Sequence, residues 1–427
     1  MSQYEMHKVG RTTLGLLRMP HVESASIGLW FPVGSRHESA KMNGSAHFIE
    51  HMLFKGTAKR NTLEISQCIE SVGGDLNAFT SEEMTCYYAK LGSDHIDMAL
   101  DVLCDMLWHS KFLTREVERE RGVIEEEIKM YEDQPHYYVC DLLNELLWKG
   151  VSLGRPITGT LQSVSKIQSG DLIDFWKTHY TPENLTVVVA GYFEEARLDQ
   201  WIHEQTRSVQ RKLKRHDVIK FEPPAYKSLH TRAVARELQQ VQLALGCFGY
   251  ARRDERRYAE KVMAILLGGN MSSRLFQIVR EKYGLAYSIQ TSSSHFIDTG
   301  AFYIQAGLER NNLEKLIKIL AKELKRLKDK LVTKKELEQA KEYIIGQMKL
   351  GLESTSNQMM WMGESIIGRG DILDPHVVIE KVRAVTTRDV QSIARDLFCP
   401  GRMRLVCLGP DLTDAGLKTM AESLNKI

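Results

Sequence analysis

The sequence predicts an α+β protein of two tandem homologous domains, each a mostly antiparallel sheet with helices packed on one side. The chain has 427 residues, which is enough for two domains with substantial cores. Strand-like and helix-like segments recur in the same order in both halves, and matching strands are offset by about 210 to 218 residues. We place the domains at residues 1–210 and 229–427, joined by a linker at 211–228.

Hydrophobic periodicity places the elements of this repeat. The first half contains expected strands at 27–33, 76–80, 85–91 and 185–190, with helices at 62–72, 94–109 and 114–131. The second half contains expected strands at 241–248, 286–293, 301–307 and 403–408, with helices at 254–267, 312–328 and 334–350. A further short helix follows the strand at 27–33.

Composition narrows the function classes. A net charge of +2 gives no overall attraction to nucleic acid or to an anionic membrane, and no apolar run approaches the ~20 residues that span a bilayer. The basic run at 211–216 is interpreted as part of a solvated linker. The N-terminus lacks the blocks of a signal peptide, and seven cysteines without paired spacing favour reduced thiols. We therefore expect a cytoplasmic protein without nucleic-acid or membrane partners.

The short helix contains His47-Phe48-Ile49-Glu50-His51. Residues at i, i+3 and i+4 share one helix face, so two imidazoles and a carboxylate point at one spot. Two imidazoles suit zinc, and a carboxylate beside them suits a general base. This order of residues is the signature of the inverzincins. The same five residues also arise by chance, so the motif needs a second observation.

The helix expected at 114–131 supplies that observation. Glu120 and Glu127 are seven residues apart and lie on nearly the same face, two turns apart. A catalytic zinc site takes three protein ligands, and a carboxylate from this helix would be the third. The other acidic residues of the helix are interpreted as its solvated face. Ligand type also permits manganese or cobalt.

These segments resemble the pitrilysin and mitochondrial-processing-peptidase group of zinc metallopeptidases. The resemblance extends over nearly the whole chain and is carried by four segments: 34–36, 44–57, 73–81 and 120–128. In that family the third ligand is a glutamate about 75 residues beyond the second histidine, which implies Glu127 here. Glu120 matches the position whose carboxylate supports the site from behind.

The second half is expected to lack the metal. Shifting the motif by the repeat offset reaches Lys261, Ala264 and Ile265, and the equivalent of Glu127 is Gln347. One zinc ion per chain follows. The resemblance instead assigns Arg280 and Tyr287, seven residues apart, to holding the substrate backbone and stabilising the developing oxyanion. The alternative for this pair is a surface salt bridge and a packed strand tyrosine.

The resemblance implies a zinc-dependent endopeptidase that hydrolyses peptides or unfolded segments in an enclosed chamber between two halves. Glu50 is expected to act as the base, and the substrate to extend along the strand containing Asn77, Ala78 and Phe79. The resemblance also suggests a homodimer. One alternative is a catalytically silent, partner-dependent subunit that binds peptides, and another is a zinc hydrolase with a small-molecule substrate.

Overall fold

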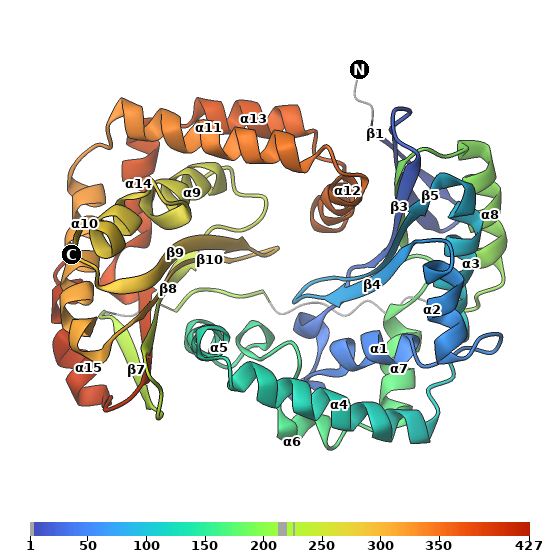
Figure 1. Cartoon of the computed structure of the whole chain (residues 1–427), viewed down its shortest axis with the longest axis horizontal. Helices are drawn as coiled ribbons and strands as arrows, with labels where there is room; N and C mark the ends of the chain where they lie inside the picture. The colour runs from blue at the N-terminus through green and yellow to red at the C-terminus, as the bar shows by residue number, and fades with distance from the viewer. Residues whose placement is uncertain (1–3, 212–219, 225–226) are drawn as a thin grey trace. The chain divides into compact units, whose positions relative to one another are not determined.

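The computed structural model describes residues 4–211, 220–224 and 227–427 (Figure 1). The described chain forms two compact units, each containing one sheet. Unit 1 draws on Met1–Met130, Arg155–Val218 and Lys349–Asp374. Unit 2 draws on Tyr131–Gly154, Ile219–Met348 and Pro375–Ile427.

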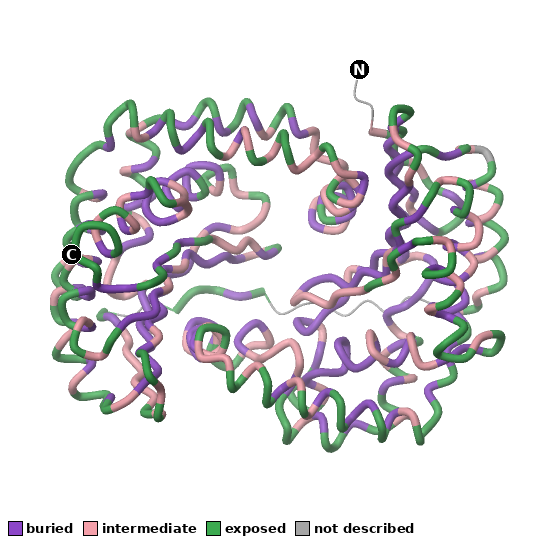
Figure 2. Tube along the Cα trace, in the orientation of Figure 1, coloured by how far each residue is buried: buried purple, intermediate pink, exposed green. Residues whose placement is uncertain are grey.

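Unit 1 is built on a six-stranded sheet. Its strands, in spatial order, are β1 (Tyr4–Val9), β2 (Thr12–Arg18), β6 (Thr186–Gly191), β3 (Ser24–Phe31), β5 (Thr85–Gly92) and β4 (Asp75–Thr80). Neighbouring strands are antiparallel except β2 and β6, which are parallel. Figure 2 shows β3 buried along nearly its whole length, as its run of apolar residues predicts. β4 lies at an edge of the sheet.

Most helices of unit 1 cover one face of this sheet. Their apolar stripes pack in a single core with Ile27, Leu29 and Phe31 of β3. These helices are α1 (Ser45–Leu53), α2 (Thr62–Glu70), α3 (Ile96–His109), α4 (Thr114–Glu132), α6 (Leu161–Val164), α7 (Ser169–His179) and α8 (Glu195–Arg207). The opposite face contacts one helix, α12 (Thr355–Arg369), through a separate cluster around Trp30 and Met359.

Among the described residues, unit 2 repeats the sheet without an equivalent of β1. Its strands are ordered β7 (His230–Ala235), β11 (Met403–Gly409), β8 (Val241–Gly249), β10 (Gly300–Leu308) and β9 (Ala286–His295). The pair β7 and β11 is parallel and the others are antiparallel, so both order and direction match β2, β6, β3, β5 and β4. The internal repeat and the predicted fold class are confirmed.

Helices again cover both faces of the second sheet. One face packs against α9 (Arg257–Ala264), the π-helical turns Ile265–Gly269 and Phe276–Lys282, α10 (Leu313–Asp329), α11 (Lys334–Gly351), α13 (Pro375–Ala384), α14 (Thr387–Leu397), α15 (Asp414–Met420) and α16 (Glu422–Asn425). The other face packs against α5 (Pro135–Leu147), whose Leu143 and Leu147 lie in one cluster with Ala244 and Phe248 of β8.

The compact units differ from the predicted domains in two segments. Residues 131–154, with α5, belong to unit 2, and residues 349–374, with α12, belong to unit 1. Each half of the chain therefore supplies one helix to the sheet of the other half, and each sheet has helices on both faces rather than on one. Periodicity identifies a helix but not the sheet on which it packs. The predicted linker at 211–228 lies largely outside the described residues.

Glycines allow each sheet to pack closely against the helix that comes from the other half of the chain. A Cβ atom on Gly363 of α12 would overlap the indole of Trp30, and a Cβ atom on Gly28 of β3 would overlap Met359. In unit 2, a Cβ atom on Gly246 of β8 would lie 2.9 Å from Leu143 of α5. Interiors are close-packed, so these contacts leave no room for even one extra methyl group.

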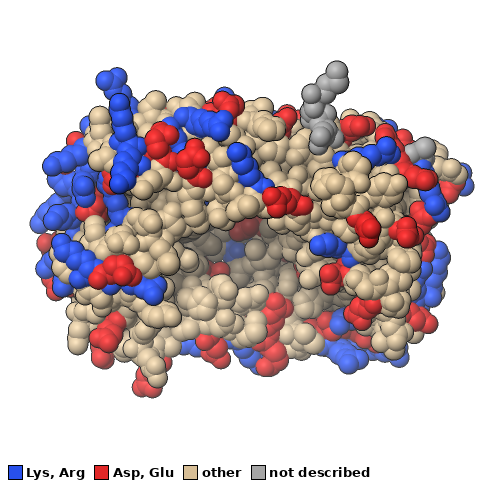
Figure 3. All heavy atoms as spheres, turned by 45° about the horizontal axis from the view of Figure 1, so that its top comes forward, with Lys and Arg blue, Asp and Glu red and all other residues tan. Residues whose placement is uncertain are grey.

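The next features are the surface charge, the possibility of a membrane-spanning helix and the state of the cysteines. On the face shown in Figure 3, both units expose basic and acidic side chains. Within the described ranges, no helix combines the length and apolar character needed to cross a bilayer. All seven cysteines have free thiols.

The close approach of α12 to its sheet yields a stability prediction. Gly363→Ala should lower the thermal unfolding midpoint, because overpacking a filled core costs about 1–3 kcal/mol. Gly346 in α11 is a matched control, because a Cβ atom there meets nothing within 4 Å. Gly346→Ala should raise or preserve the midpoint, since alanine is favoured over glycine inside a helix by about 1 kcal/mol. Equal midpoints for the two variants would contradict the packing argument.

Candidate metal centre

The two histidines of the sequence motif lie together on α1. Their ring centroids are 4.7 Å apart, and the helix buries this region against the rest of unit 1. The helix starts at Gly44, whose φ of 97° lies in the left-handed region that glycine adopts readily. A side chain there would also meet the backbone of Thr158. Glycine is therefore required where the chain enters the motif.

Helix α4 supplies the third candidate ligand. Glu127 Oε2 lies 3.6 Å from His47 Nε2 and 3.5 Å from His51 Nε2. One donor atom from each of the three residues lies within 4.8 Å of the others, and no other such group of three occurs in the part of the chain that the structure describes. The spacing of seven residues between Glu120 and Glu127 thus places both carboxylates on the side of α4 that meets α1.

The donor set fits zinc. Two imidazole nitrogens and one carboxylate oxygen form the three-ligand set of catalytic zinc sites, which leaves a position for water or substrate. All three side chains are partly or largely buried, with 11, 22 and 23% of the His47, His51 and Glu127 side chains exposed. The repeat-related positions on α9 are Lys261 and Ala264, whose side chains are not of the types that ligate zinc.

Glu120, to which the resemblance assigns support of the site, contacts His51 and Lys55. Its Oε2 lies 3.1 Å from His51 Nδ1, and its Oε1 lies 2.7 Å from Lys55 Nζ. Holding Nδ1 leaves Nε2 of the same ring facing Glu127. Burial tends to raise the pKa of Glu120, but the hydrogen bonds from His51 and Lys55 outweigh it and lower that pKa. Lys55, one turn beyond His51, was not among the residues predicted from the sequence.

The surroundings of the two histidines shift their pKa values in opposite directions. Burial, reinforced by the charge of His51, lowers the pKa of His47 to about 4. Burial also disfavours the charged form of His51, but hydrogen bonds to Glu120 and Glu127 prevail and raise its pKa to about 9. The hydrogen bond from His51 is in turn the main cause that lowers the pKa of Glu127. Without metal, the site therefore holds one proton on His51, between two carboxylates.

Glu50 occupies a different environment from the ligands. Its Oε2 accepts a hydrogen bond of 2.5 Å from Thr80 Oγ1, at the end of β4. Burial raises the pKa of Glu50, and the Thr80 hydrogen bond opposes that rise. A carboxylate with a raised pKa is a stronger proton acceptor than an ordinary one. Thr80 connects the Glu50 carboxylate directly to the edge strand.

The predicted substrate strand is β4. Asn77, Ala78 and Phe79 pair with Tyr88, Tyr87 and Cys86 of β5. The other edge of β4 pairs with no strand in the described sheet. Phe79 packs edge-on against Trp30 at 5.5 Å, which anchors the strand, whereas Asn77 is exposed. An anchored strand with a free edge is the geometry to which an extended peptide adds by main-chain hydrogen bonds.

Arg280 and Tyr287 lie together in unit 2. Arg280 is on the π-helical turn Phe276–Lys282, and its guanidinium carbon is 5.3 Å from the centroid of the Tyr287 ring. Tyr287, on β9, is 78% exposed. The exposed ring does not fit the packed strand tyrosine of the alternative, whereas Arg280 Nε lies 3.9 Å from Glu281 Oε1, as in the surface salt bridge of that alternative. The predicted role of this pair at the metal centre stays a prediction.

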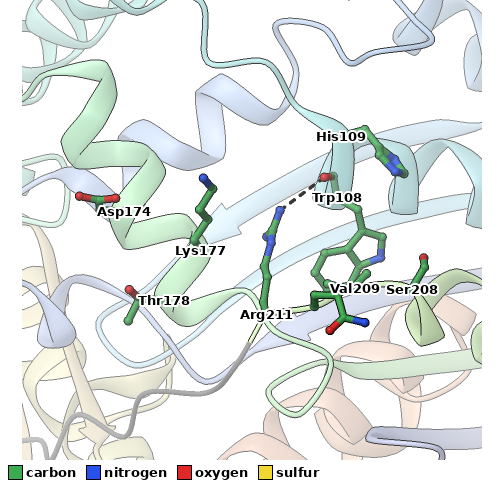
Figure 4. Close-up of a pocket in the computed structure, with 9 residues that line it drawn as sticks. Trp108, His109, Asp174, Lys177, Thr178, Ser208, Val209 and Arg211 are labelled. Carbon is green, nitrogen blue, oxygen red and sulfur yellow. Dashed lines mark hydrogen bonds between the residues drawn. The ribbon is translucent and has the colours of Figure 1, made fainter.

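A separate cleft in unit 1 corrects the expectation that the linker starting at Arg211 is solvated (Figure 4). It is lined by residues from α3, α7 and the segment after α8, including Trp108, Lys177 and Arg211. The Arg211 guanidinium stacks 3.6 Å over the Trp176 ring and donates to the Tyr180 carbonyl at 3.1 Å. Burial lowers the pKa of Arg211 to about 10. The first residue of the expected solvated linker is therefore packed; the rest of the basic run lies outside the described residues.

Two α/β repeats, with a His-x-x-Glu-His helix and a distant glutamate in the first, define a zinc-protease type of centre. Residues 16–161 match the family model described as insulinase, peptidase family M16, and residues 166–344 match the model described as the peptidase M16 inactive domain. The chain belongs to peptidase family M16, a family of zinc proteases.

Relatives from several bacteria agree with this assignment. The chain is 38% identical to an uncharacterized zinc protease of Streptomyces coelicolor, covering 94% of this chain and 90% of the relative. It is 40% identical to the uncharacterized zinc protease YmxG of Bacillus subtilis, covering 89% and 91%. The fold is similar to that of a protease from Helicobacter pylori, with a TM-score of 0.88 at 20% identity over 95% of this chain and 99% of that one.

Zinc affinity should depend on pH through His51. Because its pKa is about 9 without metal, zinc must displace a proton at neutral pH. Below pH 9 the apparent affinity should rise about tenfold for each unit of pH increase. Competition titrations with a chelator at pH 6.5, 7.5 and 8.5, corrected for protonation of the chelator, measure this slope. A flat profile would show that His51 is neutral in the metal-free protein.

Removing the supporting carboxylate should weaken metal binding. Glu120→Gln is expected to lower zinc affinity about 10- to 100-fold, the usual effect of losing the partner that orients a ligating histidine. Glu126→Gln on the same helix is the control, because the Glu126 side chain is 74% exposed and pairs with Lys129. Zinc dissociation constants of both variants, measured at one pH, test the difference. Equal zinc dissociation constants for the two variants would show that Glu120 does not support the site.

Proposed function

We propose that this protein is a zinc-dependent metalloendopeptidase that hydrolyses peptides or unfolded polypeptide segments. The observation that carries the proposal is the convergence of His47, His51 and Glu127 with Glu50 close beside them. Glu50 shares their helix, yet it is hydrogen-bonded to Thr80 rather than to a ligand. Three ligands and one separate carboxylate are what metal-assisted hydrolysis of a peptide bond requires.

Each side chain then has a defined task. When bound, a zinc ion supplies a Lewis acid that lowers the pKa of water and polarises the substrate carbonyl. Glu50 accepts the proton of the attacking water and returns it to the leaving amine. Glu120 keeps the His51 imidazole oriented, and Thr80 keeps the Glu50 carboxylate in place. The two glutamates that are not ligands therefore perform different functions, proton transfer and orientation.

The proposed substrate lies extended beside β4. Main-chain hydrogen bonds to the free edge at Asn77, Ala78 and Phe79 would bind peptide backbone with little regard for sequence. We assign Arg280 and Tyr287 to holding the substrate and stabilising the developing oxyanion. The family resemblance supports this role. The exposure of the Tyr287 ring, which carries the hydroxyl, also supports it. An enclosed chamber and a homodimer belong to the same proposal.

The alternative is a silent subunit that binds peptides for a partner. The family description of an inactive domain covers residues 166–344, which supply none of the candidate metal ligands. The matched first half contains the three converging donors His47, His51 and Glu127, with Glu50 on the same helix as the histidines. This location of the ligands favours the enzyme over the silent subunit.

Peptide cleavage by the purified protein tests the proposal. A mixed library of unstructured peptides would be incubated with the wild type and with Glu50→Gln, and the products identified by mass spectrometry. The wild type should cleave the library, and Glu50→Gln should be at least about 10²-fold slower because it lacks the proton acceptor.

Metal analysis of both samples is the control. Zinc should be retained in Glu50→Gln, because Glu50 is not among the three converging donors. Zinc bound in both samples with no cleavage by either would contradict a stand-alone peptidase and favour the partner-dependent subunit. Equal cleavage by both would exclude Glu50 as the base.

A further inference from the structure

The two histidines of the metal centre are supported differently. His51 Nδ1 is hydrogen-bonded to Glu120, whereas His47 Nδ1 is buried and has no hydrogen-bond partner among the described residues. A ligating imidazole is ordinarily oriented by a bond to its second nitrogen. With that bond missing, the position of His47 depends on its backbone, which lies in the first turn of α1.

Glu38 holds this first turn. Its side-chain Oε2 accepts the Gly44 N–H at 2.8 Å, and its Oε1 accepts the Ala46 N–H at 2.7 Å. Gly44, at the start of the helix, has no side chain with which to cap the free N–H groups. A carboxylate at a helix N-terminus also interacts favourably with the helix dipole. Ala46 directly precedes His47, so the anchor lies one residue from the unsupported ligand.

Glu38 is itself fixed by its neighbours. It is 4% exposed, and its Oε2 also accepts a hydrogen bond of 3.1 Å from Asn43 Nδ2. The same Asn43 nitrogen donates to the Pro156 carbonyl at 2.9 Å, and Arg155 donates to the Glu38 carbonyl at 2.6 Å. The carboxylate therefore connects the first turn of α1 to a segment more than a hundred residues away. Such a buried, multiply bonded acceptor has no freedom to shift.

We propose that Glu38 is a positioning residue for the metal centre, whose carboxylate fixes the first turn of α1 and thereby holds His47 where its imidazole meets His51 and Glu127. This role rests on the proposed function only in requiring that the chain binds zinc, and it needs no peptide cleavage. Because Glu38 has donors on both carboxylate oxygens, an amide in its place would turn its NH₂ group toward a backbone N–H or the Asn43 amide. The first turn would then shift while His51 keeps its bond to Glu120.

The experiment compares Glu38→Gln with Glu64→Gln. Glu64 is the matched control, because it accepts the Asn61 N–H at 2.7 Å at the start of α2, which has none of the candidate ligands. Three quantities would be measured: the zinc dissociation constant by chelator competition, the visible spectrum of the Co²⁺-substituted protein, and the thermal unfolding midpoint of the metal-free protein. Burial raises the pKa of Glu38 to about 7, so measurements at pH 8 keep the carboxylate ionised.

Glu38→Gln should weaken zinc binding at least about tenfold and alter the Co²⁺ spectrum, which reports ligand geometry. Glu64→Gln should leave the zinc affinity within about twofold of the wild type and the Co²⁺ spectrum unchanged, whatever its effect on the unfolding midpoint. A purely structural role for Glu38 would lower the midpoint without changing the Co²⁺ spectrum.

A folded Glu38→Gln protein with wild-type zinc affinity and spectrum overturns the proposal and leaves the peptidase function untouched. A wild-type chain that binds no zinc overturns the proposed function and this role together. If Glu38→Gln does not fold, Glu38→Asp and Asn43→Ala decide. The first shortens the carboxylate and the second removes one of its donors. Weaker zinc binding in these variants supports the proposal, and wild-type binding overturns it.

Discussion

The contact between α1 and α4 is the constraint on which the candidate site depends. Helix α1 contains two of the three converging donors and α4 contains the third, so neither helix forms the centre alone. The contact is specified by polar bonds as well as apolar burial. Glu120 on α4 bonds His51 on α1 and also Lys55, which lies two residues beyond the end of that helix. These two bonds hold α4 against the C-terminal end of α1.

Helix α1 is held beyond this contact as well. Glu38 accepts a hydrogen bond at the N-terminus of α1. The segment that follows α1 is attached to α3, because Thr57 and Arg60 both donate hydrogen bonds to the buried carboxylate of Asp105 on α3. A metal centre requires its ligands to be placed before the metal arrives, and side-chain rotamers alone do not provide this. This placement also affects the pKa of His51. Two carboxylates beside the imidazole raise that pKa, which favours the protonated ring until a cation replaces the proton.

The two sheets show how one scaffold serves two purposes. Strand order and direction are the same in both, but the candidate ligands occur only on α1 and α4 among the described residues. What the halves share beyond the sheets is the exchange of helices, since α5 packs on the second sheet and α12 on the first. Each sheet thereby covers its second face with a helix from elsewhere in the chain, and glycines such as Gly363 permit the close approach. The exchange makes the two halves interdependent for burial of their apolar faces.

The sequence by itself determined the fold class, the repeat and the chemical type of the donors, because these depend on periodicity, residue type and local spacing. His47, Glu50 and His51 share a helix face by geometry alone, and the strands at 76–80 and 85–91 appear where alternation predicts them. The choice of Glu127 over its acidic neighbours came from family resemblance, and the structure places its Oε2 3.6 and 3.5 Å from the two imidazole Nε2 atoms.

Only the tertiary structure decided which distant groups meet. The bonds from Glu38 to α1, from Lys55 to Glu120 and from Thr80 to Glu50 join residues on different elements or different turns, so no local pattern indicates them. The same is true of α5 and α12, whose apolar stripes predict helices but not the sheets they cover. Periodicity reports which face of an element is buried, whereas the partner of that face is set by the packing of the whole chain.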